Sequence, residues 1–344
     1  MVTIKDISKR AGCSVATVSK VLNNYTDISP NTRELVLKVC EEMGYVPNSS
    51  ARSLKTHRSN TIGIIFEEIT NLGLQHPLFA KILESFKGTV EAHGYDILFL
   101  AKSMGKQNGS YLEHSKRKQV EGILVLCEDF NTDEMKELYQ SSIPVVIIDY
   151  LVNTAVTITS NNDQGIQQGV RFLKDLGHEK IAHIHGDRST FIGGTRLEAF
   201  QKTMRKLGLP VRDEYIVSGK FFSKEDGYRA MKKILELADP PTAVFCASDM
   251  QAIGAMQAIH EADKRVPDDF SIVGFDGIDL GQLVTPRLTT IRQDARRMGE
   301  IAARKMLQMI DGPEIDLNGE TVTVDTYLIN GDTTRVLKPN KEFL

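Results

Sequence analysis

Apolar residues recur every three or four positions in three short runs near the N-terminus, which is the spacing of amphipathic helices. Each run starts at a good capping residue: Thr3 with Asp6 three positions later, Ser14, and Ser29 followed by Pro30. The expected buried positions are Ile4, Ile7 and Ala11, then Val15, Val18, Val21 and Leu22, then Leu35, Val36, Val39 and Cys40 in a helix that ends near Met43. Gly12 separates the first two helices, so the pattern predicts a helix-turn-helix.

The second helix has an outer face that is small, hydroxylic and basic. Its members are Ala16, Thr17, Ser19, Lys20 and Asn23. Such a face fits the major groove of DNA. Two amphipathic helices joined by a glycine also occur in all-α cores, and the pattern alone leaves both interpretations open.

From Asn60 onward, short apolar strands alternate with amphipathic helices. The expected strands are 61–66, 95–101, 122–127, 144–149, 180–185, 242–247 and 271–275. The expected helices are 79–93, 107–118, 132–140, 163–176, 194–207, 224–237, 250–262 and 295–310. Continuous apolar strands between helices predict an α/β body with two mainly parallel sheets covered on both faces.

The body carries none of the short motifs that mark dinucleotide enzymes, nucleotide hydrolases or esterases. We therefore expect a binding protein and not an enzyme. His183, His185 and Asp187 alternate along a strand as metal ligands do, but no fourth ligand accompanies them. We expect no metal and no cofactor.

Charge is distributed unevenly along the 344 residues. Residues 1–58 hold nine lysines and arginines against five acidic residues, a net charge of +4, so the remainder carries −7 of the total of −3. A small basic end on a larger acidic body is typical of a protein that meets nucleic-acid phosphates at one end.

Three further features of the sequence indicate the cellular compartment. No apolar run approaches the roughly 20 residues of a membrane span, and charged residues occupy the N-terminus where a signal peptide would be apolar. Cys13, Cys40, Cys127 and Cys246 lie scattered in apolar patterns, which favours buried, reduced thiols. We expect a cytoplasmic protein without membrane contact.

Residues 3–55 closely resemble the N-terminal headpiece of the lactose-repressor (LacI/GalR) family of bacterial transcription regulators. The segments that carry the resemblance are 3–7, 14–23, 32–33, 44–48 and 51–54, and it continues to about residue 336. It implies a helix-turn-helix headpiece at 1–46, a hinge helix at 47–59, an effector-binding and dimerisation body at 60–336, and a tail at 337–344. The body would consist of two periplasmic-binding-protein-like lobes, 60–160 with 290–320 and 161–289 with 321–336.

The resemblance also assigns DNA contacts. Val15, Ala16 and Lys20 match positions that reach base edges in the major groove. The other matching positions in the headpiece are Thr3, Ser14, Thr17, Ser19, Asn23, Thr32 and Arg33. In the hinge, Asn48, Ala51, Leu54 and Lys55 match residues that fold on operator DNA, with Leu54 as the minor-groove wedge. From composition alone, residues 48–56 would instead be a plain linker.

A small effector would bind in the cleft between the lobes, outside the carboxyl ends of the strands. Asp149 and Asp276 each end an apolar strand, and Arg196 begins a helix, where a cation gains nothing from the helix dipole. All three match effector-contacting positions. Phe79, Phe222, Ser248 and Asp249 match further cleft positions, although Phe221 is an alternative to Phe222 and Asp249 also suits helix capping.

We therefore expect a homodimeric repressor of carbohydrate-utilisation genes that binds a palindromic operator and is released by a mono- or oligosaccharide. The tail lacks a leucine heptad, so a tail-made tetramer is not expected. One alternative is a repressor that needs a purine-like or protein corepressor. Another is a sugar-binding protein or sugar enzyme without DNA function, which leaves residues 1–58 unexplained.

Overall fold

The computed structural model describes residues 2–23, 25–45, 58–66, 73–104, 107–126, 129–312 and 319–337. The chain divides into two compact units, Met1–Asn60, here called the headpiece, and Thr61–Leu344, here called the body. The predicted hinge contacts Asn48, Ala51, Leu54 and Lys55, with residues 338–344 of the tail, lie outside the described residues.

The headpiece consists of three helices, α1 (Ile4–Ala11), α2 (Val15–Leu22) and α3 (Pro30–Glu42). The predicted caps are confirmed: Thr3 and Asp6 form a capping box, and the Ser14 and Ser29 hydroxyls accept from the backbone N–H groups of Thr17 and Thr32. The helices close around one small core, made of Ile7, Ala11, Val18, Val21, Val36, Val39 and Cys40.

Two residues that were expected in this core lie outside it. Val15 is 40% exposed and Leu35 is 47% exposed. Val15 opens α2 one turn before the buried Val18, and Leu35 points about 100° away from its buried neighbour Val36. Both predictions of burial were therefore wrong.

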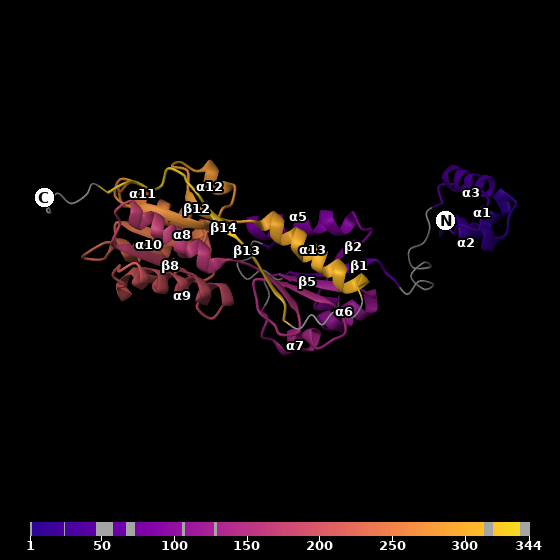
Figure 1. Cartoon of the computed structure of the whole chain (residues 1–344), viewed down its shortest axis with the longest axis horizontal. Coiled ribbons are helices and arrows are strands. Elements are labelled where there is room, and N and C mark those ends of the chain that lie inside the picture. The colour runs from indigo at the N-terminus through magenta and orange to yellow at the C-terminus, as the bar shows by residue number, and fades with distance from the viewer. Residues whose placement is uncertain are drawn as a thin grey trace. The chain divides into compact units, whose positions relative to one another are not determined.

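The first lobe of the body is a six-stranded sheet between two pairs of helices (Figure 1). Its strands, in spatial order, are β13 (Thr321–Val324), β7 (Val156–Ser160), β6 (Val145–Ile148), β5 (Gly122–Leu126), β1 (Thr61–Phe66) and β2 (Asp96–Phe99). All neighbours pair in parallel. One face packs on α5 (Pro77–Glu91) and α13 (Ala295–Asp311), and the other on α6 (Tyr111–Lys118) and α7 (Asp133–Tyr139).

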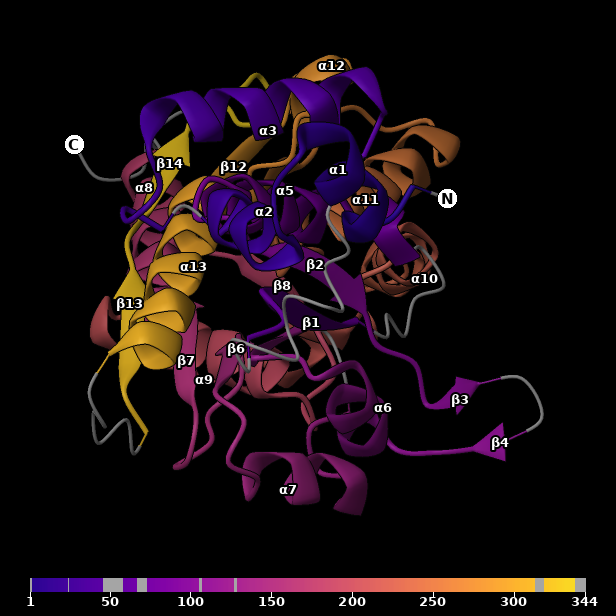
Figure 2. The same ribbon diagram turned by 90° about the vertical axis from the view of Figure 1, so that its right-hand side faces the viewer.

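A short ribbon of β3 (Ser103–Met104) and β4 (Gln107–Asn108) extends outward from this lobe (Figure 2). A 3-10 turn, η1 (Gly73–Gln75), precedes α5. The lobe's two cores therefore rest on the four predicted helices, on the four predicted strands, and on β7 and β13, which the sequence pattern did not predict.

The second lobe has the same three layers. Its strands, in spatial order, are β14 (Thr326–Ile329), β12 (Thr289–Gln293), β11 (Ser271–Asp276), β10 (Ala243–Cys246), β8 (Ile181–His185) and β9 (Ile216–Ser218). Only β14 runs antiparallel to its neighbour. One face packs on α8 (Asn162–Asp175) and α9 (Phe191–Lys206), and the other on α10 (Lys224–Leu235) and α11 (Asp249–Glu261). Shorter pieces are η2 (Asp213–Tyr215) and α12 (Leu280–Leu283).

The chain passes between the lobes three times, after β7, after β12 and after β13. The expected lobe boundaries at 290 and 321 are wrong by a few residues. Strand β12 at 289–293 belongs to the second sheet, and β13 at 321–324 belongs to the first. The strands that lead into the crossings lie at one edge of each sheet or next to it: β13 and β7 in the first sheet, and β12 beside β14 in the second. We call this edge the hinge side of the body.

The first lobe depends on a close approach of α13 to α5. A Cβ atom on Gly299 would lie 2.4 Å from the carbonyl oxygen of Ile82, whereas a Cβ on Gly88 of α5 would meet nothing within 4 Å. We predict that Gly299→Ala destabilises the body by about 1–3 kcal/mol through overpacking. The control Gly88→Ala should stabilise it by about 0.5–1 kcal/mol. Urea unfolding followed by circular dichroism would decide, and equal midpoints for both variants would contradict the packing account.

Candidate functional site

A cavity of about 550 Å³ opens between the lobes and is lined by residues from both. Five of the seven predicted effector residues lie on its wall, namely Phe79, Asp149, Arg196, Phe222 and Asp276. Asp149 and Phe79 come from the first lobe, and the other three come from the second. The fold therefore assembles one site from residues that are as much as 197 positions apart along the chain.

Arg196 is the buried cation of this site, with a side chain only 4% exposed. Its Nε donates to Asn162 Oδ1 over 2.8 Å and its Nη1 to the carbonyl oxygen of Ala247 over 2.6 Å. Nη1 also lies 3.5 Å from Asp276 Oδ1, and the guanidinium stacks 3.8 Å from the centre of the Phe275 ring. Burial lowers the pKa of Arg196, while Asp276 and Asp149 raise it. The guanidinium stays charged because its ordinary pKa is so high.

Asp149 and Asp276 both adopt positive φ, 60° and 114°, at the point where their strands end. Non-glycine residues occupy this region only where the surroundings hold them there, often at functional sites. The Thr159 hydroxyl donates to Asp149 over 2.8 Å. Burial raises the pKa of Asp149 and raises that of Asp276 to about 6, against the opposing attraction of Arg196.

Gln293, at the end of β12, is a cavity residue that the sequence pattern did not reveal. Its Nε2 donates to Asp276 Oδ1 over 2.6 Å, while its buried Oε1 accepts no hydrogen bond from the described residues. A buried acceptor without a donor is costly. This one is suited to a hydroxyl or N–H group of a ligand.

Aromatic rings form much of the remaining wall, and most of them were not predicted. Phe130 and Tyr150 stack with ring centres 4.3 Å apart, and Phe191 meets Tyr150 edge-on at 6.3 Å. Phe221 and Phe222 both line the cavity, and Phe221 is 40% exposed. Both members of this alternative therefore line the cavity, and both stay candidates for stacking on an effector.

Ser248 and Asp249 are not among the lining residues. Ser248 caps α11 and donates to the carbonyl oxygen of Phe222, and Asp249 is fully buried. Asp249 accepts from the Ile278 N–H over 2.8 Å and from the Thr290 hydroxyl. The prediction that these two residues form the cleft wall was wrong, because the strand end that faces the cleft also begins a helix. Asp249 holds the loop after Asp276, and Ser248 holds the segment at Phe222.

His178, His183 and His185 of the second lobe form hydrogen bonds with protein groups. His183 Nδ1 donates to the Phe245 carbonyl oxygen over 2.8 Å, and its ring stacks on Phe200. Burial lowers the pKa of His183 to about 3, so the ring is neutral. Asp187 accepts from the N–H and hydroxyl of Ser189. Among the described residues, no group of three or more His, Cys, Asp or Glu side chains is arranged to hold a metal ion.

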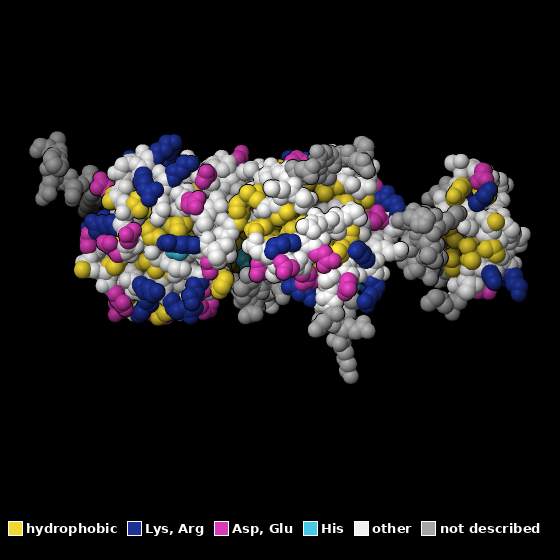
Figure 3. Space-filling model, turned by 90° about the horizontal axis from the view of Figure 1, so that it is seen from below, with side chains coloured by type: hydrophobic (Ala, Val, Ile, Leu, Met, Phe, Trp, Pro, Cys, Tyr) yellow, Lys and Arg dark blue, Asp and Glu magenta, His cyan; other side chains and the backbone are white. Residues whose placement is uncertain are grey.

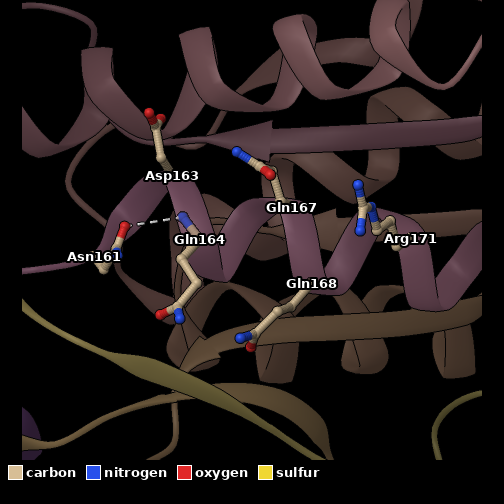
Figure 4. Close-up of a pocket in the computed structure, with 6 residues that line it drawn as sticks. All are labelled: Asn161, Asp163, Gln164, Gln167, Gln168 and Arg171. Atoms are coloured by element: carbon tan, nitrogen blue, oxygen red, sulfur yellow. Dashed lines mark hydrogen bonds between the residues drawn. The ribbon is translucent and has the colours of Figure 1, made fainter.

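A second hollow lies along α8 and is lined by Asn161, Asp163, Gln164, Gln167, Gln168 and Arg171, which all carry a polar group (Figure 4). Asn161 caps this helix by accepting from the Gln164 N–H, and Gln164 Oε1 accepts from the Thr326 N–H over 2.9 Å. Gln168 Nε2 donates to the Thr326 carbonyl oxygen. These contacts fasten α8 to β14, so the hollow has a structural explanation and lacks the aromatic walls of the cleft.

The predicted DNA-reading face of α2 lies on the surface of the headpiece. Val15, Ala16 and Lys20 are exposed. The Ser14 and Thr17 hydroxyls bond to each other over 2.9 Å, and Asn23 Nδ2 donates to the Ser19 carbonyl oxygen over 2.7 Å. Besides being predicted DNA contacts, these side chains therefore stabilise the start and the end of α2.

Lys20 has a partner that the sequence pattern did not reveal. Its ammonium group donates to the carboxylate of Asp27, in the loop between α2 and α3. This hydrogen bond lowers the pKa of Asp27, so the Asp27 carboxylate is charged at neutral pH. Both side chains are about half exposed, at 45% and 54%. The ammonium group has three donors, so two remain available for another acceptor.

The charged side chains of the body are mixed in sign. On the face drawn in Figure 3, acidic and basic side chains are interspersed over the body and do not form a large patch of one sign. Among the described residues, no helix is both long enough and apolar enough to span a membrane.

Comparisons with known proteins agree with this geometry. Residues 3–48 match the family model "Bacterial regulatory proteins, lacI family", and residues 170–334 match "Periplasmic binding protein-like domain". The repressor PurR of Pasteurella multocida is 36% identical over 90% of this chain and 92% of its own. The probable repressor ExuR of Bacillus subtilis is 34% identical over 98% and 99%. The Lac repressor dimer bound to operator and the anti-inducer ONPF superposes with a TM-score of 0.82 at 27% identity, covering 97% of this chain and 99% of the other.

The buried carboxylate of Asp249 provides a test of how the cavity is supported. We predict that Asp249→Ala destabilises the body by about 3 kcal/mol or more, because buried donors on Ile278 and Thr290 lose their acceptor. The control is Asp279→Ala, which removes only an exposed ion pair with Lys81 and should cost about 0–1 kcal/mol. Thermal unfolding of both variants is the measurement. A loss no larger for Asp249 than for Asp279 would contradict the supporting role.

Proposed function

The chain belongs to the LacI family of bacterial regulatory proteins, and we propose that a neutral saccharide, bound in its cleft, releases this repressor from its operator. The proposal depends on one observation above all. Two strand-end carboxylates, Asp149 and Asp276, flank a single buried guanidinium, that of Arg196, inside a cavity walled by aromatic rings.

Charge favours an uncharged ligand. The carboxylates of Asp129, Asp149 and Asp276 line the cavity. Arg196 already donates hydrogen bonds to Asn162 and to the carbonyl oxygen of Ala247. A phosphorylated ligand would add negative charge to a wall that has one cation and three acids. Sugar hydroxyls can donate to carboxylates and accept from a guanidinium, while the C–H face of a sugar packs against aromatic rings.

Ligand binding favours closure because the site is divided between the lobes. A ligand that contacts Asp149 on one side and Asp276 on the other gains its full interaction energy only when the lobes are close together. It therefore shifts the population toward closed conformations by its difference in affinity for the two states. We propose that closure separates the two hinge segments and weakens operator binding.

We propose that the chain acts as a homodimer on a palindromic operator. A single headpiece contacts too few base pairs for genomic specificity, and paired half-sites mirror a two-fold axis. The similarity to the Lac repressor dimer supports this assembly. Light scattering that finds a monomer at micromolar concentration would count against it.

A purine-like corepressor is the second candidate. Asp276 and the stacked aromatic rings would also suit a planar base with N–H donors. Calorimetry against saccharides and nucleobases separates the two. Binding by nucleobases alone, with tighter operator binding as a result, would replace the inducer with a corepressor.

The first prediction from this proposal concerns base reading. We predict that Lys20→Ala relaxes the preference for guanine at one position in each operator half-site, because in this proposal the exposed Lys20 ammonium group donates to guanine O6 and N7. Selection from DNA with randomised half-sites, followed by anisotropy titration, would measure it. An equal loss of affinity for every base at that position would make Lys20 a phosphate contact only.

A companion variant tests the partner of Lys20. Asp27→Asn removes the carboxylate that neutralises the Lys20 ammonium group. We therefore expect the logarithm of the operator binding constant to fall more steeply with the logarithm of the salt concentration, by about one unit of slope. The exposed Glu34, which lies in α3, provides the charge-matched control Glu34→Gln. If both variants change the slope equally, the Lys20–Asp27 pair has no specific effect.

The second prediction concerns pH and the effector. Because the pKa of Asp276 is raised to about 6, its carboxylate gains a proton as the pH falls from 7 to 5, and ligand hydroxyls then lose a charged acceptor. We predict that saccharide affinity falls about tenfold over that interval. Asp276→Asn should bind weakly at both pH values, with little pH dependence and unchanged operator affinity. An unchanged calorimetric affinity for wild type at pH 5 would contradict this.

A further inference from the structure

One ion pair of the body joins the two lobes directly. Lys81, on α5 of the first lobe, donates from Nζ to Oδ1 of Asp279 in the second lobe over 2.7 Å, although 198 positions separate the two residues. This hydrogen bond lowers the pKa of Asp279. Every other ion pair between described residues of the body lies within one lobe.

The loop that carries Asp279 is fixed to the second lobe. Gly277 has a φ of 69°, and a Cβ atom there would lie 2.5 Å from a side-chain atom of β12, so the loop passes directly over that strand. The N–H of Ile278 donates to the buried carboxylate of Asp249 over 2.8 Å. Asp279 precedes α12 but makes no capping hydrogen bond with its side chain. Its carboxylate is therefore held in place and available to the first lobe.

Other cations near this pair do not join the lobes. Lys81 and Asp279 line a hollow of about 220 Å³ together with Arg292 and Arg296. Arg292 belongs to β12 of the second sheet, so its attraction to Asp279 stays within the second lobe. Arg296, on α13 of the first lobe, donates from Nε to Glu300 on the same helix over 3.1 Å. Lys81 is therefore the cation that carries the attraction between the lobes.

A second direct contact between the lobes is aromatic and lies farther from the hinge side. Phe191, the first residue of α9, approaches the ring of Tyr150 edge-on, with ring centres 6.3 Å apart and an angle of 76°. The Tyr150 ring is fixed, because it stacks on Phe130 and its hydroxyl donates to Asn131 Oδ1 over 2.7 Å. Edge-to-face pairs are favourable beyond the area that they bury. The two contacts therefore join the lobes at separate points, one by charge and one by ring packing.

We infer that the Lys81–Asp279 ion pair and the Tyr150–Phe191 ring pair form a clasp that holds the two lobes together through protein groups alone, and that salt weakens it. The ion pair is open to dissolved ions, since its side chains are 40% and 73% exposed. The screening length falls from about 10 Å at 0.1 M salt to about 3 Å at 1 M. Loss of a pair with this exposure changes an equilibrium about two- to fivefold.

The clasp goes beyond the proposed function, because it acts on lobe closure whatever the chemistry of the ligand. A ligand that closes the lobes has to supply only the part of the closing free energy that the clasp does not. The ionic strength of the surroundings would thus set the ligand concentration at which the lobes close.

The sequence contains no tryptophan, so a single tryptophan placed in the clasp reports on it without background. In Phe191→Trp, the indole packs on Tyr150 when the lobes are together and meets water when they separate. Acrylamide quenching of its fluorescence measures this exposure in the full chain, without ligand or DNA. Between about 0.05 M and about 1 M sodium chloride, we expect quenching to increase as the ratio of joined to separated lobes falls about two- to fivefold.

Variants in the Phe191→Trp background assign this response to the ion pair. Lys81→Gln should be strongly quenched already at low salt, and Lys81→Glu more strongly still, because two carboxylates then repel each other. Combining Lys81→Glu with Asp279→Lys should restore the low-salt value. The matched control is Arg287→Gln, which removes an exposed ion pair with Asp332 inside the second lobe and should keep the full salt response.

Two results would overturn the clasp: equal salt responses with and without Lys81, or a double charge reversal that does not restore the low-salt quenching. Circular dichroism confirms that each variant is folded. If Phe191→Trp does not fold, Tyr150→Trp gives the same readout from the first lobe. Because neither ligand nor operator takes part, failure of the clasp leaves the proposed inducer standing, and failure of the inducer leaves the clasp standing.

Discussion

The buried guanidinium of Arg196 is the constraint on which the cleft depends. A charge taken out of water is very costly unless it is paired and hydrogen-bonded, and removing one partner of such a group is strongly destabilising. Arg196 meets this requirement with Asn162, the carbonyl oxygen of Ala247, the carboxylate of Asp276 and the face of Phe275. Satisfying one cation therefore fixes the start of α8, the end of β10 and the end of β11 relative to α9, which carries Arg196.

This constraint also reaches the hinge. Asn162, which accepts from Arg196, donates from its own Nδ2 to the carbonyl oxygen of Ser160, the last residue before the first crossing between lobes. Gln293, which donates to Asp276, is the last residue before the second crossing. Two of the three crossings are thus tied directly to the group that a ligand would contact. If the lobes close on a ligand as proposed, a ligand that redistributes the hydrogen bonds of Arg196 and Asp276 would act on the segments about which they move.

Local sequence signals predicted the parts of the fold that local physics determines. The capping box at Thr3 and the strand-end position of Asp276 follow from residue type and from the apolar run beside them. Asp249 was placed wrongly because a residue between a strand and a helix can face the cleft or support it, and only packing decides. Gln293 was missed because strand β12 was not among the predicted strands, and its pairing with β11 brings Gln293 to Asp276. Tyr150 was missed because only the carboxylate beside it, Asp149, was considered at the end of that strand. The contact of Lys20 with Asp27 likewise depends on the path of the loop between α2 and α3, which has no periodic pattern.

The central claim is that the cleft and the operator-binding headpieces are coupled, and thermodynamic reciprocity tests it most directly. Operator affinity should be titrated by fluorescence anisotropy with and without the saccharide identified by calorimetry, and saccharide affinity should be titrated with and without operator. The account predicts that each ligand weakens the other by the same factor, about 5- to 150-fold for couplings of ordinary size. Saccharide binding in the cleft that leaves operator affinity unchanged would contradict it.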